Sequence, residues 1–253
     1  MMQGNQLLLK CQNCDKHVIR QTLSSGNTFG TLEWTDGRME SPMMPRNHDL
    51  PLWCCPKCRS FQWVSEMDII DETLYPFIPI KDYTFSERWE NAFEMQEPGW
   101  RQYLDGIEQW KYRTERDPDL ETYIRMLSWR RYNDRFRNKL KRKNEKRSDH
   151  GIYCIPPEDW PSKTIEVPRV PEMIENCNNA ANWLYEGNPQ KAMDKADLLR
   201  WLGRFELSLQ LLGIVKELDE FNKAVHLNRH SLLVKLSKER DPSLSVVPVG
   251  ADH

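Results

Sequence analysis

The sequence predicts an α+β protein, in which a small N-terminal β-sheet precedes a mostly α-helical remainder. Two pairs of closely spaced cysteines, Cys11/Cys14 and Cys55/Cys58, bracket a first segment rich in β-branched and aromatic residues. From about residue 86 onward, apolar residues recur at helical spacing. The chain of 253 residues is long enough for one large domain or a few small ones.

The cysteine pairs have the spacing of metal-binding turns. Each pair has a two-residue gap, so one tight turn can direct both thiolates at a single ion. Two such turns supply the four sulfurs of a closed tetrahedral zinc site, the arrangement of a zinc ribbon. The sequence therefore predicts one structural Zn²⁺, held by Cys11, Cys14, Cys55 and Cys58. The ribbon would occupy residues 1–70, which bury too little apolar area to be stable without the metal.

Three other residues are possible ligands. Cys54 is an alternative to Cys55, because zinc turns also tolerate a three-residue gap. We prefer Cys55, since Cys-Pro-x-Cys is the usual form of the turn and the first pair also has a two-residue gap. His17 and His48 could bind zinc in principle. With four cysteines already paired, we interpret both histidines as polar surface.

Composition predicts a folded chain in a reducing compartment. Mean hydropathy is -0.76, but ten tryptophans and eight tyrosines indicate packed cores. A net charge of -2 favours no kind of partner. No apolar run approaches the roughly 18 residues of a membrane helix, and the first residues form too short an apolar patch for a signal peptide. We expect a cytoplasmic protein without a membrane partner, whose cysteines are metal ligands rather than disulfides.

Between the cysteine pairs, the residues predict strands and turns. The segment 17–20 leaves the first cysteine turn as a strand, and Trp34-Thr-Asp-Gly37 carries a strong hairpin signal. Leu52-Trp53 leads into the second cysteine turn, and residues 61–64 leave it as a strand. Residues 65–80 then form an acidic connector that contains two prolines.

A second domain, residues 71–147, is predicted to be helical. Ser86 can cap a helix that runs through Trp89 and Phe93. Another helix begins at Trp100 and repeats its aromatic and aliphatic residues on one face. A third begins at Asp117-Pro118, which pairs a cap with a first-turn proline. We interpret the aromatic stripes of these helices as core packing.

The far end of the third helix is basic over residues 135–147. Its cations are Arg135, Arg137, Lys139, Lys141, Arg142, Lys143, Lys146 and Arg147. Such a run can neutralise phosphates and is also typical of nuclear localisation signals. We interpret it as a solvated helix end, which cations stabilise near a C-terminus. Nucleic-acid binding through residues 135–147 is the alternative.

The remainder divides into a linker, four helices and a tail. Residues 148–171 contain five prolines, which predict an extended linker or a strap across a helical layer. Residues 172–241 have the pattern of four helices, one of which starts at Asn188-Pro189. The tail, residues 242–253, has no strong pattern and we expect it to be mobile.

Two histidines in the last helix, His226 and His230, lie four residues apart. This spacing can hold a metal on one helical face, but Leu227 stands where the glutamate of a catalytic metal helix would be. We therefore interpret both histidines as surface residues.

The centre of the C-terminal region resembles one tetratricopeptide repeat. In that repeat, the first helix ends in Leu-Gly, an aromatic follows, and a small residue lies early in the second helix. Leu202, Gly203, Phe205 and Ser208 occupy these places, with serine where the repeat has alanine. One unit is visible and a repeat array needs about three, so residues 172–241 are described as tetratricopeptide-like helical hairpins within a bundle.

The wider pattern is similar to a family of uncharacterised bacterial zinc-ribbon proteins with a helical C-terminal region. The shared motifs are the two cysteine turns, the Ser25–Gly30 turn, the Trp34–Gly37 hairpin and the Leu127–Asp134 helix segment. All of them are metal ligands, turns and helix faces. The resemblance implies a fold and no activity.

The sequence favours a non-enzymatic protein-interaction role, as an adaptor, a scaffold or an immunity-like protein, with another protein as partner. A zinc with four cysteine ligands has no open position for a water, and no phosphate-cradling loop or nucleophile elbow is visible. The alternative is a nucleic-acid-associated factor that uses residues 135–147, and an enzyme ranks third. Neither the partner nor the oligomeric state follows from the sequence.

Overall fold

Two units make up the chain, and each is assembled from two separate stretches of sequence. The first, here the β unit, comprises Met1–Thr31 and Glu40–Gln102, and the second, the helical unit, comprises Leu32–Met39 and Tyr103–His253. The computed structural model describes residues 2–25, 32–40, 50–73, 87–110, 118–143, 145–148, 151–154, 164–184, 187–216 and 224–247. The structure is of the mixed α+β class that the sequence predicts.

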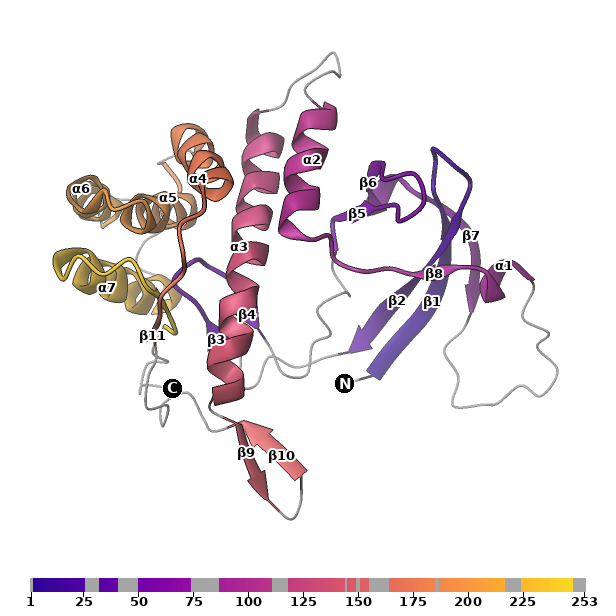
Figure 1. Cartoon of the computed structure of the whole chain (residues 1–253), viewed down its shortest axis with the longest axis horizontal. Coiled ribbons are helices and arrows are strands. Elements are labelled where there is room, and N and C mark those ends of the chain that lie inside the picture. The colour runs from indigo at the N-terminus through magenta and orange to yellow at the C-terminus, as the bar shows by residue number, and fades with distance from the viewer. Residues whose placement is uncertain are drawn as a thin grey trace. The chain divides into compact units, whose positions relative to one another are not determined.

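The β unit is built on a four-stranded sheet with the order β7-β1-β2-β8 (Figure 1). Its strands are β1 (Met2–Lys10), β2 (His17–Ser25), β7 (Asp68–Thr73) and β8 (Phe93–Glu94). β1 pairs antiparallel with β2 and β7, and β8 pairs parallel with β2. A separate antiparallel pair and two short helical segments complete it: β5 (Leu52–Cys54), β6 (Phe61–Trp63), η1 (Val64–Glu66) and α1 (Glu87–Glu90).

Strands β7 and β1 of this sheet differ from the sequence-based expectation. β7 falls in the predicted acidic connector, where Asp68, Asp71 and Glu72 are exposed. Because β7 lies at the edge of the sheet, it tolerates such charges. β1 is not predicted from the sequence, although Leu8 and Leu9 supply buried side chains to the core.

The helix predicted through Phe93 is also wrong. α1 is only four residues long, and residues 93–94 form strand β8. The Met95 N–H donates to the Ile19 carbonyl at an N···O distance of 2.8 Å, and the Met95 side chain is buried in the core of the β unit. This tertiary pairing outweighs local helix propensity. The contacts place these residues in the β unit, which includes residues up to Gln102.

The helical unit holds the longer helices. They are α2 (Trp100–Trp110, which begins in the β unit), α3 (Pro118–Lys143), α4 (Pro171–Trp183), α5 (Pro189–Trp201), α6 (Phe205–Val215) and α7 (Ala224–Lys238). Three short antiparallel pairs accompany them: β3 (Leu32–Glu33) with β4 (Met39–Glu40), β9 (Glu145–Ser148) with β10 (Gly151–Cys154), and β11 (Thr164–Ile165) with β12 (Leu244–Ser245). No described helix has both the length and the apolar character needed to cross a membrane.

Local signals in the C-terminal helices are confirmed. The Asn188 side chain accepts a hydrogen bond from the Lys191 N–H (3.0 Å), which caps α5 ahead of Pro189. Gly203 adopts a left-handed φ of 83° between α5 and α6, the conformation expected at a helix end. Ser208 is buried on α6, with its hydroxyl 3.0 Å from that of Ser237 on α7. The serine thus has a hydrogen-bonding partner in a position where alanine would have none.

The Trp34–Gly37 hairpin forms as predicted, but it belongs to the helical unit. The Gly37 N–H donates to the Trp34 carbonyl (2.8 Å), and Gly37 has a φ of 73°. Trp34, Thr35 and Asp36 are fully buried. In the helical unit, β3 and β4 lie beside α3 (Figure 1). The segment therefore completes the helical core instead of extending the small sheet.

Ion pairs and hydrogen bonds from α3 hold this hairpin. The Asp36 carboxylate accepts hydrogen bonds from the Arg137 guanidinium (2.6 Å) and the Asn133 amide (2.8 Å). Arg130 donates to the Asp36 backbone carbonyl (3.0 Å). Arg137 is fully buried and its guanidinium lies 5.6 Å from the centre of the Trp34 ring. The prediction that Arg137 is part of a solvated helix end is therefore wrong.

Residues of α7 and α5 also contact or surround the Trp34–Gly37 hairpin. Arg229 donates to the Thr35 carbonyl (2.7 Å) and pairs with Asp194 (2.6 Å), and both partners of this ion pair are buried. Arg130 pairs with the other oxygen of Asp194 (3.0 Å). Without the hairpin, the buried Arg229 guanidinium would keep Asp194 but lose the Thr35 carbonyl, and an unpaired buried polar group is costly.

The predicted tail and linker are partly structured. Leu244 to Val247 are buried, the Ser245 carbonyl accepts from the Thr35 N–H (2.9 Å), and residues 248–253 lie outside the described part. In the proline-rich segment 148–171, residues 151–154 and 164–165 are strands. Tyr132 on α3 donates to the Pro168 carbonyl (2.8 Å), which favours the strap over the free linker for residues 164–170.

Replacing Gly37 with alanine should destabilise the helical unit by about 2–4 kcal/mol, because a Cβ there would be strained and overpacked. An alanine Cβ would lie 2.8 Å from an Asp194 carboxylate oxygen and 2.9 Å from an Arg130 nitrogen. Gly213 on α6 is the matched control, since a Cβ there would meet no described atom within 4 Å apart from its chain neighbours and the backbone of its own helix. Gly213→Ala should stabilise the chain by about 0.5–1 kcal/mol. Urea unfolding followed by circular dichroism measures both variants. Changes in the free energy of unfolding that have the same sign in Gly37→Ala and Gly213→Ala would contradict this account.

Candidate metal centre

The first cysteine turn is a closed backbone loop. The Cys11 N–H donates to the Lys16 carbonyl (2.8 Å), and the Asp15 N–H donates to the Cys11 carbonyl (2.9 Å). Asp15 adopts a left-handed φ of 56°, a conformation that aspartate tolerates better than most residues. The turn brings the sulfurs of Cys11 and Cys14 to the same side of the chain.

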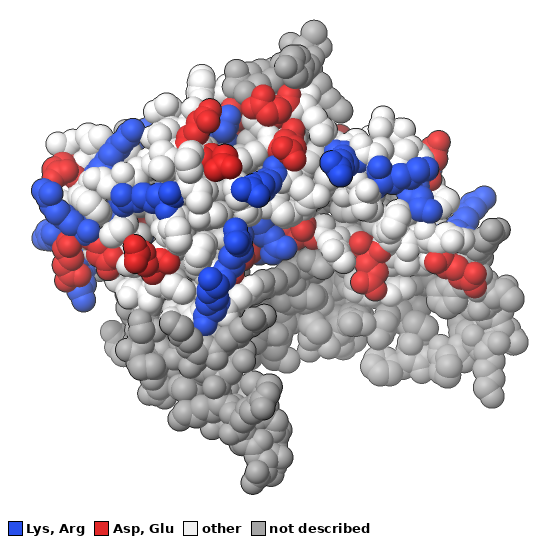
Figure 2. All heavy atoms as spheres, viewed as in Figure 1, with Lys and Arg blue, Asp and Glu red and all other residues white. Residues whose placement is uncertain are grey.

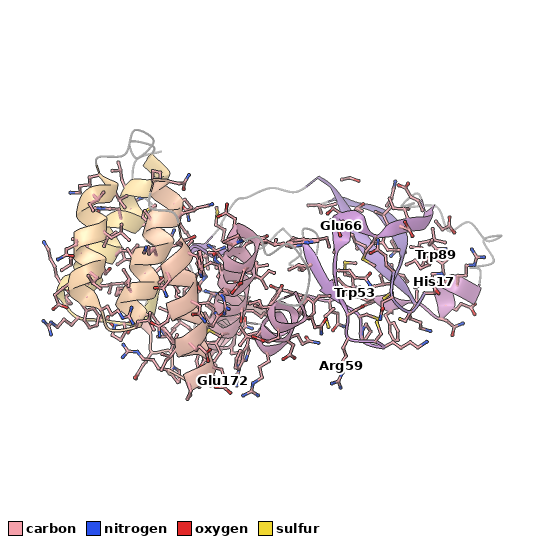
Figure 3. The ribbon with its side chains drawn as sticks, turned by 90° about the horizontal axis from the view of Figure 1, so that it is seen from above. His17, Trp53, Arg59, Glu66, Trp89 and Glu172 are labelled. Atoms are coloured by element: carbon pink, nitrogen blue, oxygen red, sulfur yellow. The ribbon has the colours of Figure 1, made fainter. Side chains whose placement is uncertain are left out.

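The second cysteine turn repeats this geometry. The Cys55 N–H donates to the Ser60 carbonyl (3.0 Å), the Arg59 N–H donates to the Cys55 carbonyl (2.8 Å), and Arg59 has a φ of 58°. The Arg59 side chain extends outward from the turn (Figure 3). Two equivalent turns therefore present two pairs of sulfurs, those of Cys11 and Cys14 and those of Cys55 and Cys58.

The four sulfurs meet in one cluster. Cys11 Sγ lies 3.7 Å from Cys58 Sγ, and Cys14 Sγ lies 3.6 Å from Cys55 Sγ. All four atoms lie within 4.8 Å of one another. Zinc–sulfur bonds of about 2.3 Å in a tetrahedron require sulfurs separated by roughly 3.8 Å. The cluster therefore has the dimensions of a four-thiolate metal site.

The other candidate ligands lie outside this cluster. Cys54 precedes the second turn, and its sulfur lies 3.8 Å from the Arg59 carbonyl oxygen and 3.7 Å from the Gln102 amide nitrogen. His17 is on β2 and is not among the residues of the metal-binding cluster found in the described chain. His48 lies outside the described residues.

Hydrogen bonds favour ionised sulfur at two of the four positions. Burial opposes ionisation of Cys58, but the side chains of Asn13 and Ser60 lower its pKa to about 6. Burial also opposes ionisation of Cys11, but hydrogen bonds from the backbone N–H groups of Asn13 and Cys14 outweigh it and lower the pKa of Cys11. Burial raises the pKa of Cys55 to about 12. A bound cation would favour the thiolate form at that position too.

Gln62 is a contributor that the sequence does not reveal. It lies on β6, where strand alternation gives no reason to expect a buried side chain, yet it is only 8% exposed. Its amide nitrogen donates to the Cys11 sulfur (3.0 Å) and to the Ser60 hydroxyl (3.2 Å). Its amide oxygen accepts from the Gln12 N–H (3.2 Å). Gln62 therefore links the two cysteine turns through one amide.

Gln62→Met should weaken zinc binding by about 10–100-fold, because it removes an N–H donor to a ligand sulfur while keeping the side chain's size. Gln102→Met is the matched control, since Gln102 donates to Cys54 rather than to a cluster sulfur. Competition with a chromophoric chelator measures both affinities. A Gln62→Met protein that binds zinc as tightly as the control would show that this hydrogen bond does not tune the site.

An apolar core surrounds the cluster. Cys11 and Cys55 are fully buried within it, and its other members include Leu9, Val18 and Trp53, the last labelled in Figure 3. An apolar shell limits access of water to the sulfurs. Two of the four cysteines thus belong to the hydrophobic core of the β unit, and the other two pack against it.

The other sequence-predicted site residues do not gather into a second site within the described chain. In the basic run, Arg135 and Lys139 are exposed, Arg137 is buried, and the side chains of residues 141–147 lie outside the described part.

The last helix differs from expectation in a similar way. His230 is buried against the Leu212 carbonyl (2.8 Å), and burial lowers its pKa, so the surface interpretation is wrong for this residue. The side chain of His226 lies outside the described residues.

Comparison with known proteins adds no relative to these observations: no family model, no curated protein and no solved structure matches this chain.

Proposed function

We propose that this chain is a non-enzymatic protein-interaction protein, of adaptor or scaffold type, stabilised by one structural Zn²⁺. The ligands would be Cys11, Cys14, Cys55 and Cys58. The observation that carries this proposal is the set of four sulfurs within 4.8 Å. Four thiolates fill the tetrahedral positions of zinc, and such a site contributes folding energy rather than an open position for substrate.

The proposed partner is another protein, bound through the helical unit. Its helices expose large apolar side chains that are not needed for its own core: Trp183 on α4, Leu207 and Ile214 on α6, and Leu227 on α7. Each is 44–52% exposed. Apolar surface on helical hairpins is a common basis of protein recognition. The tetratricopeptide-like pattern and the resemblance to bacterial zinc-ribbon proteins support the same role, in the cytoplasm.

A matched pair of surface variants tests this role. Trp183→Ser/Leu207→Ser should abolish retention of a stoichiometric protein partner from the native host. Ile69→Ser, on exposed β7 of the β unit, should retain it. Zinc content should be unchanged in both. The proposal would be contradicted if the wild type and both variants retained the partner equally, or if only nucleic acid were recovered.

The nucleic-acid alternative has less support. Arg137 is committed to the buried pair with Asp36, so it is not available to a phosphate. On the face shown in Figure 2, Lys and Arg are interspersed with Asp and Glu over the described surface. Electrostatic binding of nucleic acid favours a continuous basic patch.

A further inference from the structure

The Trp34–Gly37 hairpin connects the metal centre to the helical unit through the path of the chain. The chain enters the hairpin from β2 and leaves it toward β5, so both flanking elements belong to the β unit. Cys14 precedes this segment and Cys55 follows it, with their sulfurs 3.6 Å apart. A metal held there closes the chain loop that carries the hairpin.

The far end of the same loop is fixed by buried contacts in the helical unit. The Asp36 carboxylate and the Arg137 guanidinium are both 0% exposed. Arg229 holds the Thr35 carbonyl from α7, and Val247 donates its N–H to the Glu33 carbonyl (2.8 Å). These contacts define one docked arrangement of the hairpin in the helical unit.

We propose that metal binding and hairpin docking are coupled: zinc strengthens the docking of residues 32–39 in the helical unit, and the docked hairpin strengthens zinc binding. This inference rests on the proposed zinc site. Chain entropy is the physical cause. Without metal, the β unit would lose much of its folding energy. The chain segment between the hairpin and α2, which runs through the β unit, would then behave as a long flexible loop.

The expected size of the coupling follows from loop closure. Each halving of the flexible path favours closure by a factor of about three. Folding of the β unit around the metal shortens the flexible path to roughly a quarter of its length. This favours closure, and therefore docking of the hairpin, by about eightfold. Linkage requires the same factor in both directions, so a residue of α3 that touches no sulfur should alter zinc affinity.

The test measures Zn²⁺ affinity of the full-length chain by competition with a chromophoric chelator. Asp36→Asn should weaken zinc binding about fivefold to tenfold. Asn133→Ala, which removes a single donor to Asp36 (2.8 Å), should weaken it by a smaller factor and serves if the first variant fails to fold. Glu121→Gln is the matched control, because Glu121 is a buried α3 carboxylate that pairs with Arg125 and not with the hairpin. It should leave zinc affinity within about twofold.

Hydrogen exchange provides the reciprocal readout. Removing zinc from the wild-type chain should raise amide exchange in α3 around Asn133 and in α7 around Arg229. The coupling would be overturned if Asp36→Asn and Asn133→Ala both bound zinc with wild-type affinity, or if Glu121→Gln weakened zinc binding as much as they do. Either result would leave the metal site intact. A wild-type chain that binds no zinc would overturn the metal site itself, so the two failures are distinguishable.

Discussion

Replacing Arg137 with methionine should lower the free energy of unfolding of the helical unit by about 3–5 kcal/mol. The substitution leaves the Asp36 carboxylate buried without its guanidinium partner, which lies 2.6 Å away in the native chain. It also removes a hydrogen bond to the Asp134 carboxylate (3.0 Å). Urea unfolding followed by helical circular dichroism measures the change.

Arg135→Met is the control, two positions away on the same helix. Arg135 is exposed, so its replacement should change stability by no more than about 0.5 kcal/mol. Similar losses in both variants would mean that the two arginines are equally solvated, contrary to the structure.

The Arg137 variant should also lose part of the acid sensitivity of the wild-type protein. Burial raises the pKa of Asp36, but Arg137 and Asn133 outweigh it and hold that pKa below its usual value of 3.8. The stabilisation is therefore present above that value and disappears as pH falls through the lower folded-state pKa. Without Arg137, the low-pH loss of stability should be smaller.

The second large effect concerns the metal ligands. Cys11→Ser/Cys55→Ser should reduce bound zinc from about one per chain to none and unfold most of the β unit, because each turn loses a ligand that is also buried in the core. The helical signal at 222 nm should be largely retained, since α3 to α7 lie in the other unit. Elemental analysis and circular dichroism provide the two readouts.

Cys54→Ser is the control for the ligand assignment. The Cys54 sulfur contacts a backbone carbonyl and an amide rather than the cluster, so this variant should keep its zinc. Loss of zinc from Cys54→Ser, or retention in the double variant, would refute the assignment.

Local signals are the part of this structure that can be predicted. A two-residue gap between cysteines, the Asp-Gly turn at Gly37 and the cap at Asn188 each act over a few residues, and all three form. The four-cysteine cluster follows from two such turns. The identity of the ion and the binding partner do not follow from local spacing.

What the sequence could not show depends on contacts far apart in the chain. Asp36 and Arg137 are separated by 101 positions, so Arg137 resembles every other cation in a basic run. Phe93 carries a helical pattern, but pairing with Val18 in the sheet decides its conformation. Gln62 is polar on a short strand, and only the folded turns reveal the sulfur beside it.

Synthesis of the chain gives the hairpin a further consequence. Thr35 and Arg229 are 194 positions apart, and the ribosome adds about 5–20 residues per second. Trp34 and Asp36 therefore emerge about 10–40 s before the helix that completes their site. During that interval the Thr35 carbonyl, which lies in a fully buried residue, remains without its Arg229 partner on α7. Early metal capture by the nascent β unit would not shorten this delay, and we expect the helical unit to fold only after translation has reached α7.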